Sequence, residues 1–109
     1  MLAKPILRAG RLRRVPPSFS WVDHRLVRAG YLRRADAKAW ALYLVLVTVG
    51  DEQGLSYYGE ASLGRLLSLS PEELATARRQ LEAAAVIAYE RPFYQVLGLD
   101  NPAGSEPLP

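Results

Sequence analysis

The segment that follows Asp36 constrains the fold more than any other, because its apolar residues occupy every face of a helix. Asp36 provides an N-cap, and the helix is expected to run to about Val49, before Gly50 and its polar neighbours end it. A helix that is apolar all round is a buried one, so we expect it to be the central element of the core. At 109 residues, the chain has room for one such core and one domain.

The clearest local signal is the start of a later helix at Ser70. Ser at the N-cap, Pro71 at the first helical position and Glu73 three residues after the cap have the spacing of a capping box. Apolar residues that recur at helical spacing predict its buried face: Leu74, Ala77, Leu81 and Ala84. The residues expected to face outward are Thr76, Arg79, Gln80 and Ala83. Arg78 is expected at the core margin, where its side chain either extends along apolar surface with its charge in water or pairs with Glu82.

Weaker signals predict three shorter elements before Ser70. Residues 20–23 have the spacing of a helix N-cap, and Gly30 supplies a left-handed stop, which predicts a helix over 21–29. Residues 55–58 alternate as a short strand does, and a helix is expected from residue 59 or 60 to 67.

Two β-prone runs near the end of the chain predict a hairpin. They are residues 86–89 and 93–97, joined by a turn at 90–92 that contains Pro92. The expected fold class is therefore mainly α, with a small β-hairpin. We expect one core that buries Trp40, Leu44, Leu63, Leu67, Leu74, Leu81 and Ile87.

Charge divides the chain unevenly. Residues 1–34 contain nine basic residues and one acidic residue, a net charge of +8, whereas residues 35–109 have a net charge of −5. Residues 1–17 are predicted to form a basic flexible arm, since bases alternate with single apolar residues and two prolines end the segment. We expect residues 18–99 to form the domain and residues 100–109 to be a disordered tail. Such polarity favours a polyanionic partner for the first third.

Several function classes are disfavoured by composition. With no cysteine and a single histidine, His24, the chain offers no thiolate, no disulfide and no conventional zinc site, and we expect no metal or other cofactor. No enzyme is expected, because no nucleophile–base motif or glycine-rich phosphate loop is present. The longest apolar run is too short to span a membrane, and no signal-peptide pattern is seen, which predicts a cytoplasmic protein without a membrane partner.

The order helix, short strand, helix, tight turn, capped helix and hairpin resembles that of winged helix-turn-helix domains over residues 37–97. The motifs that carry the resemblance are Ala41-Leu-Tyr-Leu44, Gly54-Leu-Ser-Tyr-Tyr58, Ser70 and Leu81-Glu-Ala-Ala-Ala-Val-Ile87, and they look like domains of bacterial replication initiators and mobile-element accessory proteins. The resemblance implies that the helix after Ser70 enters the major groove and that the hairpin is a wing against the DNA backbone. Ser68 stands at a turn position where glycine is common.

The resemblance and the charge together nominate the residues that hold double-stranded DNA. The arm arginines are expected along a groove or the phosphates, Thr76 and Arg79 on the reading face, and Arg91 at the wing tip. The full set is Arg8, Arg11, Arg13, Arg14, Thr76, Arg79 and Arg91. The aromatic residues at core spacings are expected to pack rather than to stack on bases: Trp21, Trp40, Tyr43, Phe93 and Tyr94.

Two alternatives to a DNA-binding accessory or regulatory protein follow from the same residues. The capped helix begins with Glu72 and Glu73, which repel phosphate and favour a protein-interaction domain that docks a basic partner in a nucleoprotein, replication or transposition assembly. RNA binding by the arginine-rich arm alone is the third interpretation.

Overall fold

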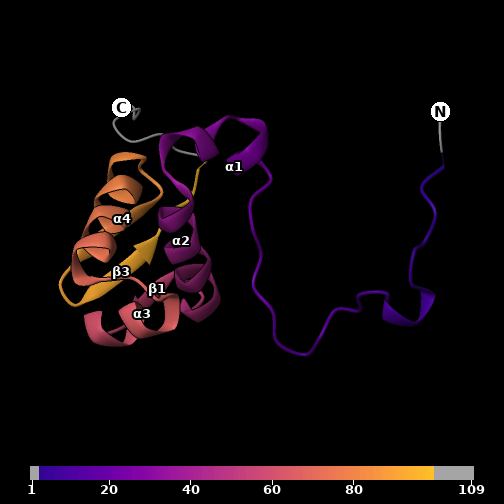
Figure 1. The fold of residues 1–109 in the computed structure, drawn as a ribbon, viewed down its shortest axis with the longest axis horizontal. Helices are drawn as coiled ribbons and strands as arrows, with labels where there is room; N and C mark the ends of the chain where they lie inside the picture. Colours follow the sequence, from indigo (N-terminus) through magenta and orange to yellow (C-terminus); the bar gives the residue numbers. More distant parts are fainter. Residues whose placement is uncertain (1–2, 100–109) are drawn as a thin grey trace.

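The computed structural model describes residues 3–99. In this range the chain forms four α-helices and one three-stranded antiparallel sheet (Figure 1). The helices are α1 (Arg25–Arg28), α2 (Ala37–Val49), α3 (Glu60–Leu67) and α4 (Pro71–Ala83), and the strands are β1 (Leu55–Tyr57), β2 (Ile87–Glu90) and β3 (Phe93–Val96). Two short 3-10 helices, η1 (Ala9–Arg11) and η2 (Tyr31–Arg34), precede α2. The predicted tail, 100–109, lies outside the described residues.

The hairpin of β2 and β3 confirms the expectation for residues 86–97, and β1 extends it into a sheet. The strand order is β1-β3-β2, so β3 is central. In the pairing, Tyr57 lies opposite Phe93, and Tyr89 lies opposite Tyr94. Gly54, just before β1, has φ +82, and a Cβ there would lie 2.6 Å from the Val96 carbonyl oxygen. Only glycine therefore lets this end of β1 approach β3 so closely.

The predicted core is largely correct. Leu74, Ala77, Leu81 and Ala84 are all buried, as their spacing indicates, and Leu63 and Ile87 join them. From α2 the core takes Ala39, Leu42, Tyr43 and Leu46, and from β3 it takes Tyr94. Trp40 and Leu67 are only partly buried against this cluster.

The expectation that α2 is buried on every face is wrong. Leu44 is 60% exposed, and Val49 is also exposed. The inner face of α2 packs on α4 and β3, and the start of α2 lies beside η2, where the Trp40 indole N–H donates to the Leu32 carbonyl at 3.0 Å. No described element covers the side that carries Leu44, because a chain of this length has too few helices to surround α2 completely.

The first helix is shorter than predicted. It begins at Arg25 rather than near residue 21, and Ser20 does not cap it. Instead, the Asp23 carboxylate accepts the Arg25 backbone N–H at 2.9 Å and pairs with the Arg25 guanidinium at 2.6 Å. Only Leu26 of this helix is buried, so no apolar face supports a longer one. Gly30 is left-handed with φ +81, as predicted for the stop.

Two of the five aromatic residues expected in the core are exposed. Trp21 is 75% exposed and Phe93 is 54% exposed, whereas Tyr43 and Tyr94 are buried. Trp21 lies before the first buried residue of the domain, and Phe93 points to the opposite side of β3 from Tyr94 because neighbouring strand residues alternate. The expectation that these aromatic residues pack in the core is therefore confirmed for Tyr43 and Tyr94 and, in part, for Trp40.

Candidate nucleic-acid interface

The turn between α3 and α4 sets the direction of the helix that carries the predicted reading face. Ser68 ends α3 in a left-handed conformation (φ 57, ψ 45), and the Leu69 N–H donates to the Gly64 carbonyl at 3.0 Å. At Ser70 the capping box is complete, with the Ser70 hydroxyl accepting the Glu73 N–H at 3.1 Å and the Glu73 carboxylate accepting the Ser70 N–H at 2.9 Å. A carbonyl near the end of α3 and an N–H group at the start of α4 thus find hydrogen-bond partners within the three-residue link 68–70.

Thr76 and Arg79 lie together on the outer face of α4, as predicted. Both are exposed, and the Arg79 guanidinium donates to the Thr76 hydroxyl at 3.3 Å. An exposed guanidinium one helical turn from a hydroxyl can donate to a phosphate or to the edge of a guanine. Gln80, also expected to face outward, is partly buried, because its side-chain amide exchanges hydrogen bonds with Asp36 at the start of α2.

Arg78 lies beside Arg79 in sequence but in a different environment. Its guanidinium donates to Glu60 of α3 at 2.6 Å and to the Tyr94 hydroxyl at 3.2 Å, and it lies over the Tyr89 ring at 4.5 Å. Burial by itself would lower the pKa of Arg78, but the Tyr94 hydrogen bond and the Glu60 charge raise it overall. The expected position of Arg78 at the core margin is confirmed, since its side chain is only 15% exposed. The alternative pairing with Glu82 is wrong, because Glu60 of α3, distant in sequence, forms the ion pair instead.

The acidic start of α4 is less repulsive to an anion than the sequence indicates. The Lys38 ammonium of α2 pairs with the Glu73 carboxylate at 2.5 Å, and this hydrogen bond is the main reason that the pKa of Glu73 is lowered. Sequence reasoning missed Lys38, since no local pattern links residues 35 positions apart. Glu72 is exposed and remains the acidic group at this helix end.

The four arm arginines are exposed to solvent. Every residue from 3 to 22 is exposed, and the segment leads away from the body of the protein (Figure 1). Among residues 3–99, Arg8 donates a hydrogen bond to the neighbouring Leu7 carbonyl alone, at 2.9 Å. Within the described part of the chain, no carboxylate forms an ion pair with Arg8, Arg11, Arg13 or Arg14.

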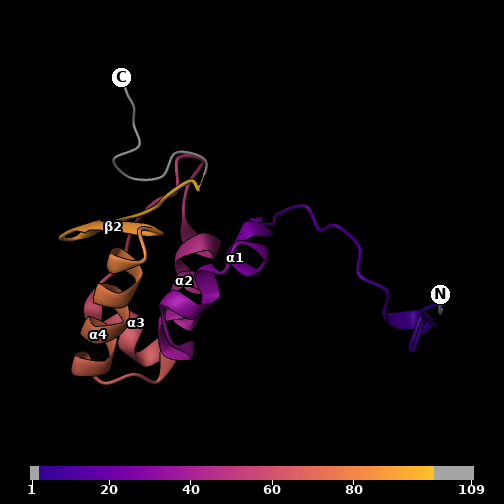
Figure 2. The same ribbon diagram turned by 90° about the horizontal axis from the view of Figure 1, so that it is seen from above.

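The candidate residues do not form one continuous surface. Both ribbon views place α2 between α4 and the arm (Figures 1 and 2). Arg91 is exposed in the turn between β2 and β3. An extended arm of about 15 residues spans on the order of 50 Å, more than the ~34 Å of one turn of duplex. The arm can therefore contact the same DNA as α4 without touching α4.

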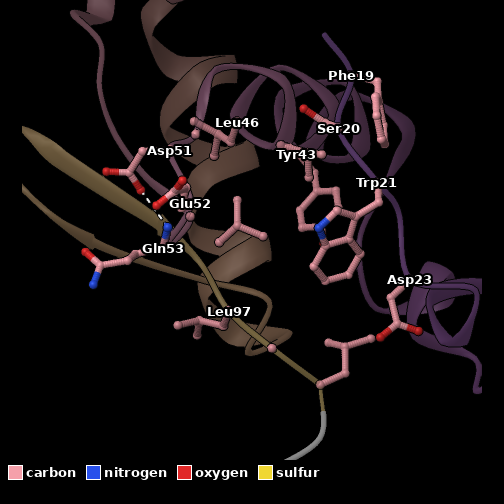
Figure 3. A pocket seen from close by; sticks show the side chains of 16 residues that line it. Phe19, Ser20, Trp21, Asp23, Tyr43, Leu46, Asp51, Glu52, Gln53 and Leu97 are labelled. Atoms are coloured by element: carbon pink, nitrogen blue, oxygen red, sulfur yellow. Dashed lines mark hydrogen bonds between the residues drawn. The ribbon is translucent and has the colours of Figure 1, made fainter. Parts of the chain in front are cut away.

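A cavity of about 520 Å³ lies between the end of α2, the loop before β1 and the residues that follow β3. Trp21 and Tyr43 line one side of it, and Asp51 and Gln53 line the other (Figure 3). Two of its three carboxylates are already engaged: Asp51 accepts the N–H groups of Gln53 and Leu55, and Asp23 pairs with Arg25. Hydrogen bonding to Arg25 lowers the pKa of Asp23 to about 2. With acidic and no basic residues in its wall, this cavity is not suited to an anion and does not belong to the candidate interface.

Comparison with known families, curated proteins and solved structures finds no match for this chain. Within residues 3–99, every helix is too short or too polar to cross a bilayer.

Proposed function

We propose that this chain is a winged-helix DNA-binding protein, in which the outer face of α4 contacts a groove, the β2–β3 turn contacts the adjacent backbone, and the arm neutralises further phosphates. The observation that carries the proposal is the arm, with its four exposed arginines and no ion pair to a described carboxylate. Fixed positive charge in this form attracts a polyanion at long range.

The arrangement of elements supports the winged-helix part of the proposal. A left-handed turn joins two helices, the second of which presents Thr76 and Arg79, and a hairpin with Arg91 at its turn follows directly. This is the order in which helix-turn-helix and wing occur in DNA-binding domains of the family. Glu72 and Glu73 are the two negative charges that favour a protein-docking role for the start of α4. The ion pair with Lys38 neutralises that of Glu73.

The salt dependence of binding tests the proposal. If four arm arginines each neutralise one phosphate, the slope of log affinity against log salt is about 3.6, so a fourfold increase in salt weakens duplex binding about 150-fold. Fluorescence anisotropy with labelled duplex measures this slope. Replacing the four arginines by Gln should flatten it, whereas replacing them by Lys should preserve it. No duplex binding at low salt would refute the proposal and leave the protein-docking alternative through Glu72 and Glu73.

Arg79→Ala separates base reading from phosphate attraction. If Arg79 reads a guanine with two hydrogen bonds, its loss lowers discrimination between duplex sequences by about 1 to 3 kcal/mol while leaving most of the salt slope in place. Affinities for a selected site and for a scrambled duplex, measured with the parent and the variant, give that difference. An unchanged ratio would remove Arg79 from the reading surface.

A further inference from the structure

Two aromatic side chains share the solvent face of the sheet. Tyr57 of β1 is 70% exposed and Phe93 of β3 is 54% exposed. The two residues lie opposite each other in the β1–β3 pairing, with their ring centroids 5.8 Å apart and their planes at 57°. They form an exposed aromatic pair on a rigid, hydrogen-bonded platform.

The alternation of the strands fixes which side these rings occupy. Tyr94, the next residue after Phe93, is buried against the helices, so Phe93 and Tyr57 point the other way. Figure 2 shows the helices along one side of the sheet, and no described helix or strand covers the other side. Gln95, two residues beyond Phe93, is exposed on the same outer face.

Pairing with each other explains only part of this arrangement. Cross-strand aromatic pairs stabilise a sheet only modestly, and this pair still leaves more than half of each residue exposed to water. Exposed aromatic rings on a small sheet, beside an amide side chain and a positively charged side chain, are typical of sites that bind unstacked nucleobases. The rings stack on the nucleobases, and the amide forms hydrogen bonds with their edges. Arg91 lies two residues before Phe93, in the turn, and supplies a positive charge for the phosphates of the same strand.

We propose that the outer face of the sheet, through Tyr57 and Phe93, stacks unpaired bases, so that the preferred ligand is DNA in which a single strand adjoins a duplex. This inference rests on the proposed DNA binding and deepens it. Glu90 lies opposite Phe93 on β2, the side away from Tyr57. Because that carboxylate repels phosphate, the bases lie across the rings on the side of Phe93 that faces Tyr57.

Three labelled DNAs test the inference with the full-length protein: a duplex, a single strand, and the duplex with a single-stranded overhang. We expect the overhang DNA to bind more tightly than the duplex. Tyr57→Ala and Phe93→Ala should each weaken overhang binding by about 5- to 150-fold, the equivalent of the ~1–3 kcal/mol that one stacked base contributes. Duplex affinity should change less than about twofold.

Matched variants control for unspecific effects. Tyr57→Phe keeps the ring and should retain overhang binding, whereas Leu66→Ala removes a side chain 58% exposed on α3 and should change neither affinity. Phe93→Trp places an indole on the platform, and the emission that it adds to that of Trp21 and Trp40 in the parent should be quenched on adding the single strand. Circular dichroism spectra of all variants should match the parent, since none of the replaced side chains is buried.

The outcomes separate this inference from the proposed function. If duplex binding is intact but the overhang adds nothing, or if the alanine variants bind the overhang as the parent does, stacking is overturned and duplex binding stands. If the rings are needed for single-strand binding while duplex is not bound, stacking stands and groove binding fails. If neither nucleic acid changes the Phe93→Trp emission, the face belongs to a partner of another class and the inference is overturned.

Discussion

Two adjacent arginines on α4, Arg78 and Arg79, lie in different environments. Arg78 joins three other elements, since its guanidinium contacts Glu60 of α3, Tyr94 of β3 and the Tyr89 ring of β2. Arg79, one position later, contacts only Thr76 of its own helix among the interactions described. One position along a helix is a rotation of about 100°, which is enough to move a side chain from the α3–sheet junction to solvent.

Replacing these two residues should affect stability unequally. Arg78→Ala leaves the hydroxyl of the buried Tyr94 without its donor and removes packing on Tyr89, so we expect the free energy of unfolding to fall by about 1–3 kcal/mol. Arg79→Ala should change it by less than about 0.5 kcal/mol, as exposed substitutions usually do. Urea unfolding followed by circular dichroism measures both. Equal changes in the free energy of unfolding for the two variants would mean that the Arg78 contacts make no net contribution to stability.

At the scale of elements, the capping box is the feature that makes α4 begin at Pro71. Ser70→Ala removes the acceptor for the Glu73 N–H and should lower the free energy of unfolding by on the order of 1 kcal/mol. Ser62→Ala, at an exposed position inside α3, serves as a control and should not destabilise, because alanine is the better helix former. Thermal unfolding of the two variants and the parent tests the difference. Identical melting temperatures for Ser70→Ala and the parent would contradict a stabilising cap.

For the whole molecule, one core joins all the larger elements. Leu81 is fully buried among residues from α2, α3 and the sheet, so Leu81→Ala should lower the free energy of unfolding by about 2–5 kcal/mol. The transition should shift as a single step, because no second core exists in the described residues to unfold separately. Leu66→Ala, on the exposed side of α3, should shift it by less than about 0.5 kcal/mol. A biphasic melt would indicate that the sheet unfolds independently of the helices.

Local patterns in the sequence determined the element types and most of the core. The Ser70 cap, the spacing of Leu74, Ala77 and Leu81, and the β-prone runs around Pro92 each depend on residues a few positions apart, and all three expectations match the structure. The residues nominated for DNA contact on α4 and the arm are exposed as expected, although their role is a proposal.

Tertiary packing alone decided which face of α2 is covered and which charges pair between distant segments. Leu44 and Leu42 occupy the same apolar helix, yet only Leu42 is buried, because α4 and β3 lie on one side of α2. Lys38 meets Glu73, and Phe93 is turned to solvent beside Tyr57, through contacts between segments far apart in the chain. Helical and strand periodicity describe neighbours within a turn or a strand, whereas burial and ion pairing depend on which distant segment arrives opposite, and no local pattern encodes that.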